Sequence, residues 1–301
     1  MTRGVVDDQA LWFRDHHREN MERMFAAVSD LYAEHWNDFF HFALFEPGAE
    51  SAEGIDWDSA FERTHRLFAE ALAVRPGDRV LELACGRGGF SDWLAANTEG
   101  DITGIDISRA QLSHAKKHRR PNLRFLHHDI MEVDSLGDRF DRIVFMDADC
   151  YLPDKGEAVA RIARTMAPGG RFLLIAWCAR DGLLDHQREL VLDPFMRYWG
   201  VPSLETPAGY RRHFRAAGLN LVEEKDLNDR TRPNWEFGYE QAIKGVRDVS
   251  LAAAARTIWK GLTLGEEGVR LIKEQFHAAL YIKAAFDAAF LRYTWFLATK
   301  D

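Results

Sequence analysis

A short apolar run followed at once by glycines places the strongest constraint on the fold of this 301-residue chain. Residues 79–83 have the length and apolar character of a buried parallel strand. Gly86, Gly88 and Gly89 follow, and glycines permit positive φ and let another molecule approach the backbone closely. Residues 91–96 are predicted to be helical, so the turn would present free backbone N–H groups to a ligand at a helix N-terminus.

Acidic residues stand at the ends of three consecutive predicted strands. Glu82 lies just before the glycines, where a carboxylate repels phosphate and suits a ligand with a cationic or hydrogen-bond-donating tail. Asp106 ends the strand 101–106, 24 residues beyond Glu82, about the spacing at which an acid reaches a ribose diol in nucleotide-binding units. Asp129 lies in 125–130, at the end of the third strand, and can accept from an adenine amino group. Solvated turn acids are the alternative, but three acids in this pattern favour a nucleoside site.

Strands and helices alternate along most of the chain. The predicted strands cover residues 79–83, 101–106, 125–130, 140–146, 171–177, 219–224 and 291–298. The predicted helices cover residues 59–73, 91–96, 109–119, 157–166 and 210–217, with Ser108 capping the helix 109–119. This alternation predicts an α/β fold with a doubly wound parallel sheet, whose ligands gather outside the carboxyl ends of the strands.

Aromatic-rich segments flank this pattern. Residues 8–48 are predicted to be helical and to cover the ligand as a lid, with extra core packing as the alternative. Insertions at 180–205 and 228–289 would form a hydrophobic cap over the strand tips, unless their aromatic residues are ordinary core. The predicted regions are an N-terminal helical lid (1–58), a ligand-binding core (59–179) and the rest of the sheet with its cap (180–301). The predicted substrate-pocket residues are Trp36, Phe40, Tyr198, Trp199 and Trp235.

Composition narrows the classes of partner. Lys and Arg number 39 against 47 Asp and Glu, a net charge of −8, and no basic cluster is longer than 116–120, which argues against nucleic acid and anionic membrane as main partners. Cys85, Cys150 and Cys178 are odd in number and lack metal-ligand spacing, which predicts reduced thiols in a cytoplasmic protein and no metal site. The sequence shows no signal-peptide core and no run of transmembrane length, and it leaves homo-oligomerisation open.

Four motifs resemble those of class I S-adenosylmethionine-dependent methyltransferases. They are Glu-Leu-Ala-Cys-Gly-Arg-Gly-Gly from Glu82, Gly-Ile-Asp-Ile-Ser from Gly104, His-His-Asp-Ile from His127 and Ala-Pro-Gly-Gly-Arg-Phe-Leu-Leu-Ile from Ala167. The resemblance implies S-adenosylmethionine as cofactor and a Rossmann-like sheet of seven strands with the last one antiparallel. It implies cofactor contacts at Glu82, Ala84, Cys85, Gly86, Gly88, Asp106, Ile107, Gln111, Asp129, Ile130 and Met146. Ala84 stands where the family commonly has glycine.

The loop after the fourth strand shows a closer resemblance. Its sequence Met-Asp-Ala-Asp-Cys-Tyr-Leu-Pro-Asp-Lys, residues 146–155, is similar to the Met-Glu-Ser-Gly-Glu-His-Met-Pro-Asp-Lys loop of γ-tocopherol methyltransferases. Related patterns occur in sterol and prenyl-diphosphate C-methyltransferases and in some alkaloid N-methyltransferases. Asp147 takes the place of the family's glutamate, and Tyr151 stands where the tocopherol enzymes have histidine. The predicted catalytic residues are Asp147, Tyr151 and His41, with Asp149 as a further candidate base.

The predicted function is methyl transfer to a bulky, largely apolar small molecule, such as a terpenoid, prenylated or polycyclic natural product, with carbon as the preferred acceptor atom. An N- or O-methyltransferase of an alkaloid or polyketide is the alternative. A dehydrogenase is disfavoured because the turn at Gly86 lacks the full dinucleotide glycine spacing, and the three strand-end acids disfavour a non-catalytic nucleotide-binding module. If a cation develops on the acceptor, each aromatic face could stabilise it by roughly 0.5–2 kcal/mol.

Overall fold

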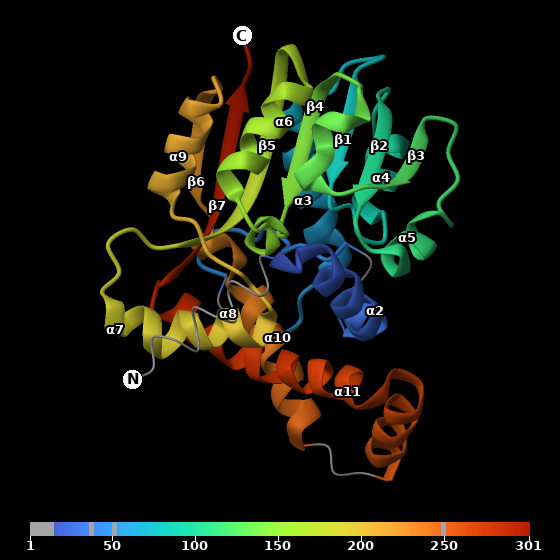
Figure 1. Cartoon of the computed structure of the whole chain (residues 1–301), viewed down its shortest axis with the longest axis vertical. Helices are drawn as coiled ribbons and strands as arrows, with labels where there is room; N and C mark the ends of the chain where they lie inside the picture. The colour runs from blue at the N-terminus through green and yellow to red at the C-terminus, as the bar shows by residue number, and fades with distance from the viewer. Residues whose placement is uncertain (1–14, 36–38, 50–52, 248–250) are drawn as a thin grey trace.

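A seven-stranded sheet forms the centre of the computed structural model, which describes residues 15–35, 39–49, 53–247 and 251–301. The strands are β1 (Arg79–Leu83), β2 (Asp101–Asp106), β3 (Leu123–His127), β4 (Phe140–Met146), β5 (Met166–Ala179), β6 (Asn220–Asp226) and β7 (Leu291–Thr299). Their order across the sheet is β3-β2-β1-β4-β5-β7-β6 (Figure 1). β1 to β5 run parallel, and β7 is antiparallel to β5 and β6. The predicted seven-stranded α/β sheet with an antiparallel last strand is confirmed.

Helices cover both faces of this sheet. They are α3 (Trp57–Leu72) and α4 (Gly89–Asn97) on one face, and η1 (Ile130–Leu136), α6 (Lys155–Thr165) and α9 (Pro207–Ala216) on the other, with α5 (Arg109–Ala115) near β2 and β3. Alternate residues of β1 explain the two layers, because successive side chains of a strand point to opposite faces. Val80 shares a core with Phe68 of α3, whereas Leu81 shares the other core with Val159 of α6 and Phe214 of α9.

The predicted helix 109–119 begins as expected but is shorter. The Ser108 hydroxyl accepts a hydrogen bond from the Gln111 N–H at 3.3 Å, which confirms the predicted cap. The α-helix ends at Ala115, and the N–H groups of Lys117 and His118 close tighter turns onto the carbonyls three positions back. Pro121 then prevents any continuation, because its ring excludes helical geometry for the residue before it.

The predicted helix over residues 8–48 is only partly correct. The described part contains α2 (His17–His35), while residues 39–49 are not helical. Phe40 has φ +58°, a left-handed conformation that a right-handed helix excludes. Residues 1–14 and 36–38, which include the predicted pocket residue Trp36, lie outside the described part of the chain.

Residues 41–45, here called the strap, have no regular secondary structure and lie between the sheet and the cap. Backbone groups in a buried segment without a strand partner must find other hydrogen bonds. Elements far apart in the sequence provide them. The bonds are Phe42 N to Asp147 Oδ2 (3.0 Å), Ala43 N to Asn234 Oδ1 (2.9 Å), Asn234 Nδ2 to Ala43 O (2.8 Å), Leu44 N to Thr64 Oγ1 (2.7 Å), Phe45 N to Arg230 O (2.7 Å) and Arg230 Nε to Phe45 O (2.9 Å).

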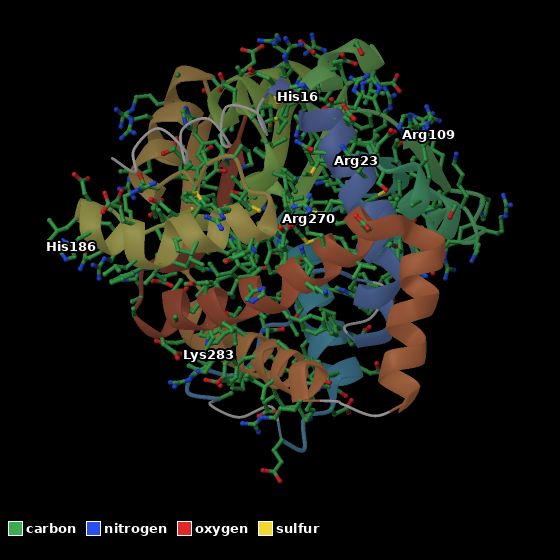
Figure 2. The ribbon with its side chains drawn as sticks, turned by 60° about the horizontal axis from the view of Figure 1, so that its bottom comes forward. His16, Arg23, Arg109, His186, Arg270 and Lys283 are labelled. Atoms are coloured by element: carbon green, nitrogen blue, oxygen red, sulfur yellow. The ribbon has the colours of Figure 1, made fainter. Side chains whose placement is uncertain are left out.

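The remaining helices gather with α2 at the end of the sheet toward which the parallel strands run (Figure 1). They are α7 (Asp185–Gln187), the π-helical turn η3 (Arg188–Leu192), α8 (Asp193–Trp199), α10 (Asn228–Arg247) and α11 (Leu251–Asp287). Figure 2 shows α2 beside α11, and the two helices are in contact. Lys283 of α11 pairs with Glu236 of α10 at 2.8 Å, which joins two helices of the cap. The three segments predicted as lid and cap therefore meet at one end of the sheet.

Candidate active site

Asp147 directly follows β4, at the edge of the sheet that the cap covers. Its N–H donates to the Ile175 carbonyl of β5 at 3.1 Å. Its Oδ2 accepts the Phe42 N–H at 3.0 Å, and its Oδ1 accepts the indole N–H of Trp177 at 3.1 Å. The backbone of Asp147 is left-handed, with φ +59°, a conformation that costs a non-glycine residue about 1–2 kcal/mol. These hydrogen bonds hold the carboxylate in place despite that strain.

The environment of Asp147 prepares it to exchange a proton near neutral pH. Burial raises the pKa of its carboxyl to about 7, against the lowering effects of the nearby Tyr293 hydroxyl, the Trp177 indole and the Phe42 amide. Near pH 7 the carboxyl is therefore divided between its neutral and ionised forms. A general base works best with a pKa close to the operating pH, so this residue has the chemistry expected of one.

Asp149, two residues further along the loop, makes a different set of hydrogen bonds. Its Oδ1 accepts the backbone N–H of Trp177 at 3.0 Å, and its Oδ2 accepts the Tyr210 hydroxyl at 2.7 Å. Burial raises its pKa to about 6, against the Tyr210 and Trp177 hydrogen bonds. The buried Lys155 ammonium donates to the carbonyls of Cys150, Leu152 and Ser203 at 2.8–3.2 Å. Asp149 and Lys155 thus fix the loop after β4, and the side chain of Asp149 is only 1% exposed.

Five rings surround the Asp147 end of the sheet. This aromatic cluster comprises Phe42 of the strap, Trp177 of β5, Tyr293 of β7, Trp235 of α10 and Phe286 of α11. The Phe42 ring lies 5.2 Å from Trp177 and 5.1 Å from Tyr293, and Trp235 stacks on Phe286 at 4.2 Å. The predicted pocket residue Trp235 is therefore placed near Asp147. An apolar, ring-lined environment next to one carboxylate suits a bulky lipophilic molecule.

Two other predicted residues, Tyr151 and Trp199, are connected to Asp147 through Trp177. The Tyr151 hydroxyl accepts a hydrogen bond from the Trp199 indole, and the Trp199 ring lies 5.9 Å from Trp177, which contacts Asp147. The Tyr151 ring also packs edge-on against Phe25 of α2 at 5.8 Å. Tyr151 and Trp199 therefore connect the lid helix to the residues that hold the carboxylate.

The predicted pocket residues Tyr198 and Phe40 lie outside the aromatic cluster around Asp147. Tyr198 stacks on His277 at 5.1 Å and on Tyr281 at 5.9 Å, both on α11, so its ring joins two helices of the cap. Phe40 is half-buried at the entrance to the strap. The sequence pattern did identify Tyr198 as an aromatic cap residue but could not tell a ring between helices from a ring beside the carboxylate.

His41 is buried on the opposite side of the strap from Phe42. Its Nδ1 donates to the Phe42 carbonyl at 3.0 Å, so its Nε2 accepts from His65 Nε2, also at 3.0 Å. Burial lowers the pKa of His41 to about 4 and that of His65 to about 2. Both nitrogens of His41 are occupied and the ring is 1% exposed. This geometry argues against the predicted role of His41 as a base and explains it as an anchor of the strap.

The glycine turn after β1 has a left-handed backbone and lies close to neighbouring side chains. Gly88 has φ +81°, and a Cβ at this position would lie 2.6 Å from the Phe125 ring, so only glycine fits. Gly86 has φ +54°, and a Cβ at this position would make an ordinary contact with Nε2 of Gln111 at 3.7 Å. Ala84 has φ +53°. This left-handed backbone is the physical reason why glycine would be favoured at position 84, where the chain departs from the family pattern.

Two of the strand-end acids are buried beside this turn. Glu82 accepts a hydrogen bond from the Ser91 hydroxyl, and burial raises its pKa to about 8. Asp106 accepts the N–H groups of Gly86 at 2.8 Å and Ser108 at 2.7 Å, and burial raises its pKa to about 6. A ligand that brings a positive charge and hydroxyl donors would favour the ionised forms of both carboxylates. These carboxylate acceptors therefore fit a cationic amino-acid tail and the hydroxyl groups of a ribose.

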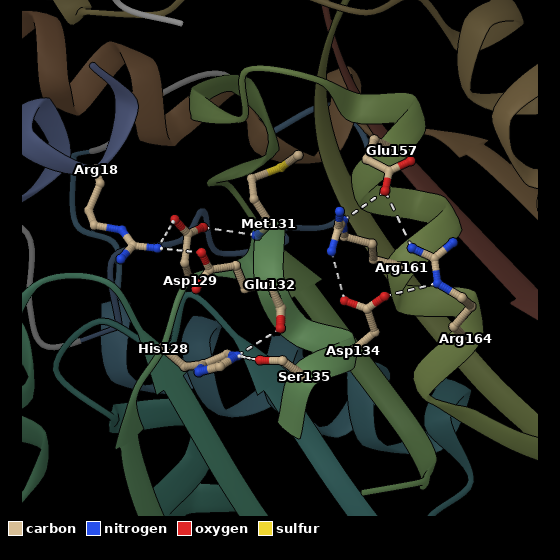
Figure 3. Close-up of polar contacts among 10 residues, drawn as sticks. All are labelled: Arg18, His128, Asp129, Met131, Glu132, Asp134, Ser135, Glu157, Arg161 and Arg164. Carbon is tan, nitrogen blue, oxygen red and sulfur yellow. Dashed lines mark hydrogen bonds and ion pairs between the residues drawn. The ribbon is translucent and has the colours of Figure 1, made fainter. Parts of the chain in front are cut away.

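The third acid, Asp129, contacts the lid helix. Its Oδ1 accepts the Met131 N–H at 2.9 Å, and its Oδ2 accepts from Arg18 of α2 at 3.2 Å. Arg18 also pairs with Glu132 at 3.0 Å, as Figure 3 shows. α2 therefore covers Asp129, the acid predicted to accept a hydrogen bond from the adenine amino group. The other predicted contact residues belong to the same edge: Cys85, Gln111, Ile130 and Met146 are buried and Ile107 is half-buried.

Comparison with known proteins decides the family. A family model described as a methyltransferase domain matches residues 55–224, more than half of the chain. The chain belongs to the methyltransferase family. It is a class I S-adenosylmethionine-dependent methyltransferase, and S-adenosylmethionine is its cofactor. The buried acids beside the glycine turn fit this cofactor's charge and hydroxyl groups.

Several methyltransferases are similar to this chain over most of their length. Methyltransferase GfsG of Streptomyces halstedii is 33% identical over 71% of this chain and 73% of its own. The 27-O-demethylrifamycin SV methyltransferase of Amycolatopsis mediterranei is 28% identical over 75% and 82%. Cycloartenol-C-24-methyltransferase of Arabidopsis thaliana is 24% identical over 83% and 75%.

Solved structures share the fold. The [4+2]-cyclase SpnF superposes with a TM-score of 0.70 at 21% identity, over 93% of this chain and 94% of its own. The cyclopropane synthase MmaA2 from Mycobacterium tuberculosis superposes with a TM-score of 0.71 at 17% identity, over 94% and 98%. These matches show that the chain shares the fold of these proteins.

Sequence reasoning missed several residues of this site. The pattern alone does not single out Trp177 and Tyr293 of the aromatic cluster, because only the sheet order places β5 beside β4 and β7 beside β5. Phe286 lies on α11, whose place in the cap the pattern does not fix. Arg18 of α2 was missed because a helix pattern does not indicate which acid the helix covers. Among the described residues there is no group of three or more potential metal ligands, and no helix long and apolar enough to cross a membrane.

Proposed function

We propose that this enzyme transfers the methyl group of S-adenosylmethionine to a bulky, largely apolar small molecule, and that Asp147 accepts the proton released by the acceptor. The observation that carries the proposal is the position of one half-buried carboxylate at the end of β4, beside five aromatic rings and under helices of the lid and cap.

The cofactor would be held by the residues of the glycine edge. Glu82 would face its ammonium group, Asp106 its ribose hydroxyls and Asp129 its adenine amino group, in accord with the order of β1, β2 and β3 in the sheet. The bound cofactor supplies a methyl group that its sulfonium already activates. The chain's own residues therefore have three tasks: to orient the acceptor, to exclude water and to take up a proton.

The division of the chain into lid, core and cap supports the exclusion of water. We assign 1–58, through α2 and the strap, to the lid, 59–179 to the cofactor core and 180–301 to the completion of the sheet and the cap. The contacts of Arg18 with Asp129 and of Phe42 with Asp147 support this assignment, because the lid region meets both the cofactor edge and the proposed base.

The substrate class follows from the aromatic cluster and from the relatives. The printed names of two relatives specify cycloartenol and 27-O-demethylrifamycin SV, and such relatives act on lipophilic substrates. We propose a terpenoid, prenylated or polycyclic natural product of this kind. Carbon is the first candidate for the acceptor atom, supported by the C-24 methyltransferase. Oxygen is the second, supported by the relative whose printed name specifies a 27-O-demethyl substrate.

The test is a transfer assay with S-adenosylmethionine carrying a 13C-labelled methyl group, offered to sterol, terpenoid and polyketide pools. A labelled product whose methyl resonance reports attachment to carbon or oxygen is the expected result, and it identifies the acceptor atom. Methylation of small polar amines or amino acids alone would contradict the substrate class.

A further inference from the structure

Ser29 of the lid helix α2 and Gln111 of α5 form a buried polar contact above the glycine turn. The two side chains are 3% and 2% exposed, and Ser29 Oγ lies 2.6 Å from Gln111 Oε1. A carboxamide oxygen can only accept a hydrogen bond, so the serine hydroxyl is the donor. A contact this short between two buried groups defines the rotation of the amide.

Arg87 fixes the direction of that hydroxyl. Its Nη1 lies 3.3 Å from Ser29 Oγ and 3.5 Å from the Ser29 carbonyl oxygen. A guanidinium has donors only, so Ser29 Oγ accepts from Arg87 and its own proton is committed to Gln111. Arg87 therefore donates a hydrogen bond to Ser29, and Ser29 donates one to Gln111.

These hydrogen bonds also determine where the nitrogen of the Gln111 amide, Nε2, lies. With Oε1 engaged by Ser29, the two protons of Nε2 point away from α2. Nε2 lies beside the glycine turn, 3.7 Å from where a Cβ on Gly86 would stand, and among the described residues it makes no hydrogen bond. It stands next to Asp106, which holds the Gly86 N–H. An amide donor and a carboxylate acceptor placed together match a ribose, whose hydroxyls both accept and donate.

We propose that Ser29 is a positioning residue for cofactor binding: it orients Gln111 so that the amide donates to a ribose oxygen of S-adenosylmethionine while Asp106 accepts from the ribose hydroxyls. The proposal rests on the proposed cofactor placement and extends it to a lid residue that does not itself touch the cofactor. It also ties the lid to the cofactor, because the amide is oriented only while α2 lies in place.

The test measures binding of S-adenosylhomocysteine by calorimetry, so it needs no methyl acceptor. Ser29→Ala frees the amide to rotate and should weaken binding about three- to tenfold, the equivalent of one neutral hydrogen bond. Gln111→Glu keeps the shape but replaces the donor by an acceptor and should weaken binding at least as much. In the Gln111→Glu background, Ser29→Ala should add nothing further, because it acts through the amide.

Controls separate this from a general effect on folding or on the lid. Ser113→Ala, on the exposed side of α5, should bind like the parent. 5′-Methylthioadenosine, which has the same nucleoside without the amino-acid end, should lose affinity in Ser29→Ala by the same factor. Unchanged affinity in Ser29→Ala, additive losses in the double variant, or a loss confined to S-adenosylhomocysteine would overturn the proposal. A parent protein that binds none of these ligands would instead contradict the cofactor placement itself.

Discussion

The indole Nε1 of Trp177 donates a 3.1 Å hydrogen bond to Oδ1 of Asp147. The backbone N–H of the same tryptophan donates to Asp149, so one residue of β5 holds both acids of the loop after β4. A hydrogen bond donated to a carboxylate favours its ionised form. Trp177 therefore opposes the effect of burial on Asp147 and helps to set the pH range in which this carboxylate can act as a base.

Replacing Trp177 by phenylalanine should move the pH dependence of turnover. The substitution keeps a ring and removes the donor, so the pKa of Asp147 should rise by roughly one unit. Because the base must be ionised, the acidic limb of the pH–rate profile should shift to higher pH. Trp295→Phe is the matched control, since its indole nitrogen has no hydrogen-bond partner among the described residues. Coincident profiles for the parent and Trp177→Phe would contradict this role.

Asp147→Asn should reduce turnover at least ~100-fold, the usual effect of losing a general base. Folding should also suffer by about 1–3 kcal/mol, because an amide can accept from only one of the two donors, Phe42 N–H and Trp177 Nε1, and presents its NH2 to the other. Turnover must therefore be measured per folded molecule, with melting followed in parallel. Asp154→Asn, the cap of α6 in the same loop, is the control and should keep parent turnover. Parent-rate turnover by Asp147→Asn would make this residue purely structural.

The order of elements and the identity of the cofactor could be predicted from the sequence because they depend on local signals. The period of the strands, the glycines at Gly86 and Gly88 and the acids at strand ends each act within one βαβ unit. The composition of the site around Asp147 could not be predicted in the same way. Trp177 and Tyr293 face each other only because β7 inserts between β5 and β6, a pairing with a long sequence separation. His41 could not be distinguished from a base, because its partner His65 lies on another element.

Asp106→Asn should weaken cofactor binding by about 10- to 100-fold, because hydrogen bonds to a charged carboxylate contribute roughly 1.5–3 kcal/mol. The measurement is calorimetry with S-adenosylmethionine. Asp101→Asn is the control, at the exposed beginning of the same strand β2, and should bind like the parent. Equal affinity in both variants would remove Asp106 from the ribose site.

Arg18→Gln should speed release of S-adenosylhomocysteine by only a few-fold. Arg18 is 53% exposed, and exposed ion pairs contribute about 0.2–1 kcal/mol. Stopped-flow fluorescence of product release is the measurement. Arg23→Gln, whose ion pair with Glu19 lies within α2, should leave the release rate unchanged. If removal of Arg18 slowed release, the Arg18–Asp129 contact would compete with the adenine rather than hold the lid over it.

The His41–His65 pair should make the protein sensitive to acid. In the unfolded chain both imidazoles have a pKa near 6.5, whereas burial lowers the pKa of His41 to about 4 and that of His65 to about 2. Their contribution to stability is present above pH 6.5 and is lost as the pH falls toward 4, because the unfolded state then binds more protons. Buried acids with raised pKa values oppose this trend, so the comparison must be between variants.

Thermal melting followed by circular dichroism between pH 6.5 and 4.5 makes that comparison. The double variant His41→Gln/His65→Gln should lose less melting temperature over this interval than the parent does. His186→Gln, an exposed histidine of α7, should follow the parent. Parallel curves for the parent and the double variant would show that the pair does not titrate on unfolding.

The strap has a consequence for the design of chimeric enzymes. Asn234 of α10 binds the backbone of Ala43 through both atoms of its amide, and Arg230 binds Phe45 in the same way through its carbonyl and guanidinium. A cap helix exchanged alone would leave these partners facing a foreign backbone. Transplanting the acceptor preference of a relative therefore requires residues 39–45 and 228–247 to move together as a single exchangeable unit, although 182 positions separate them in the chain.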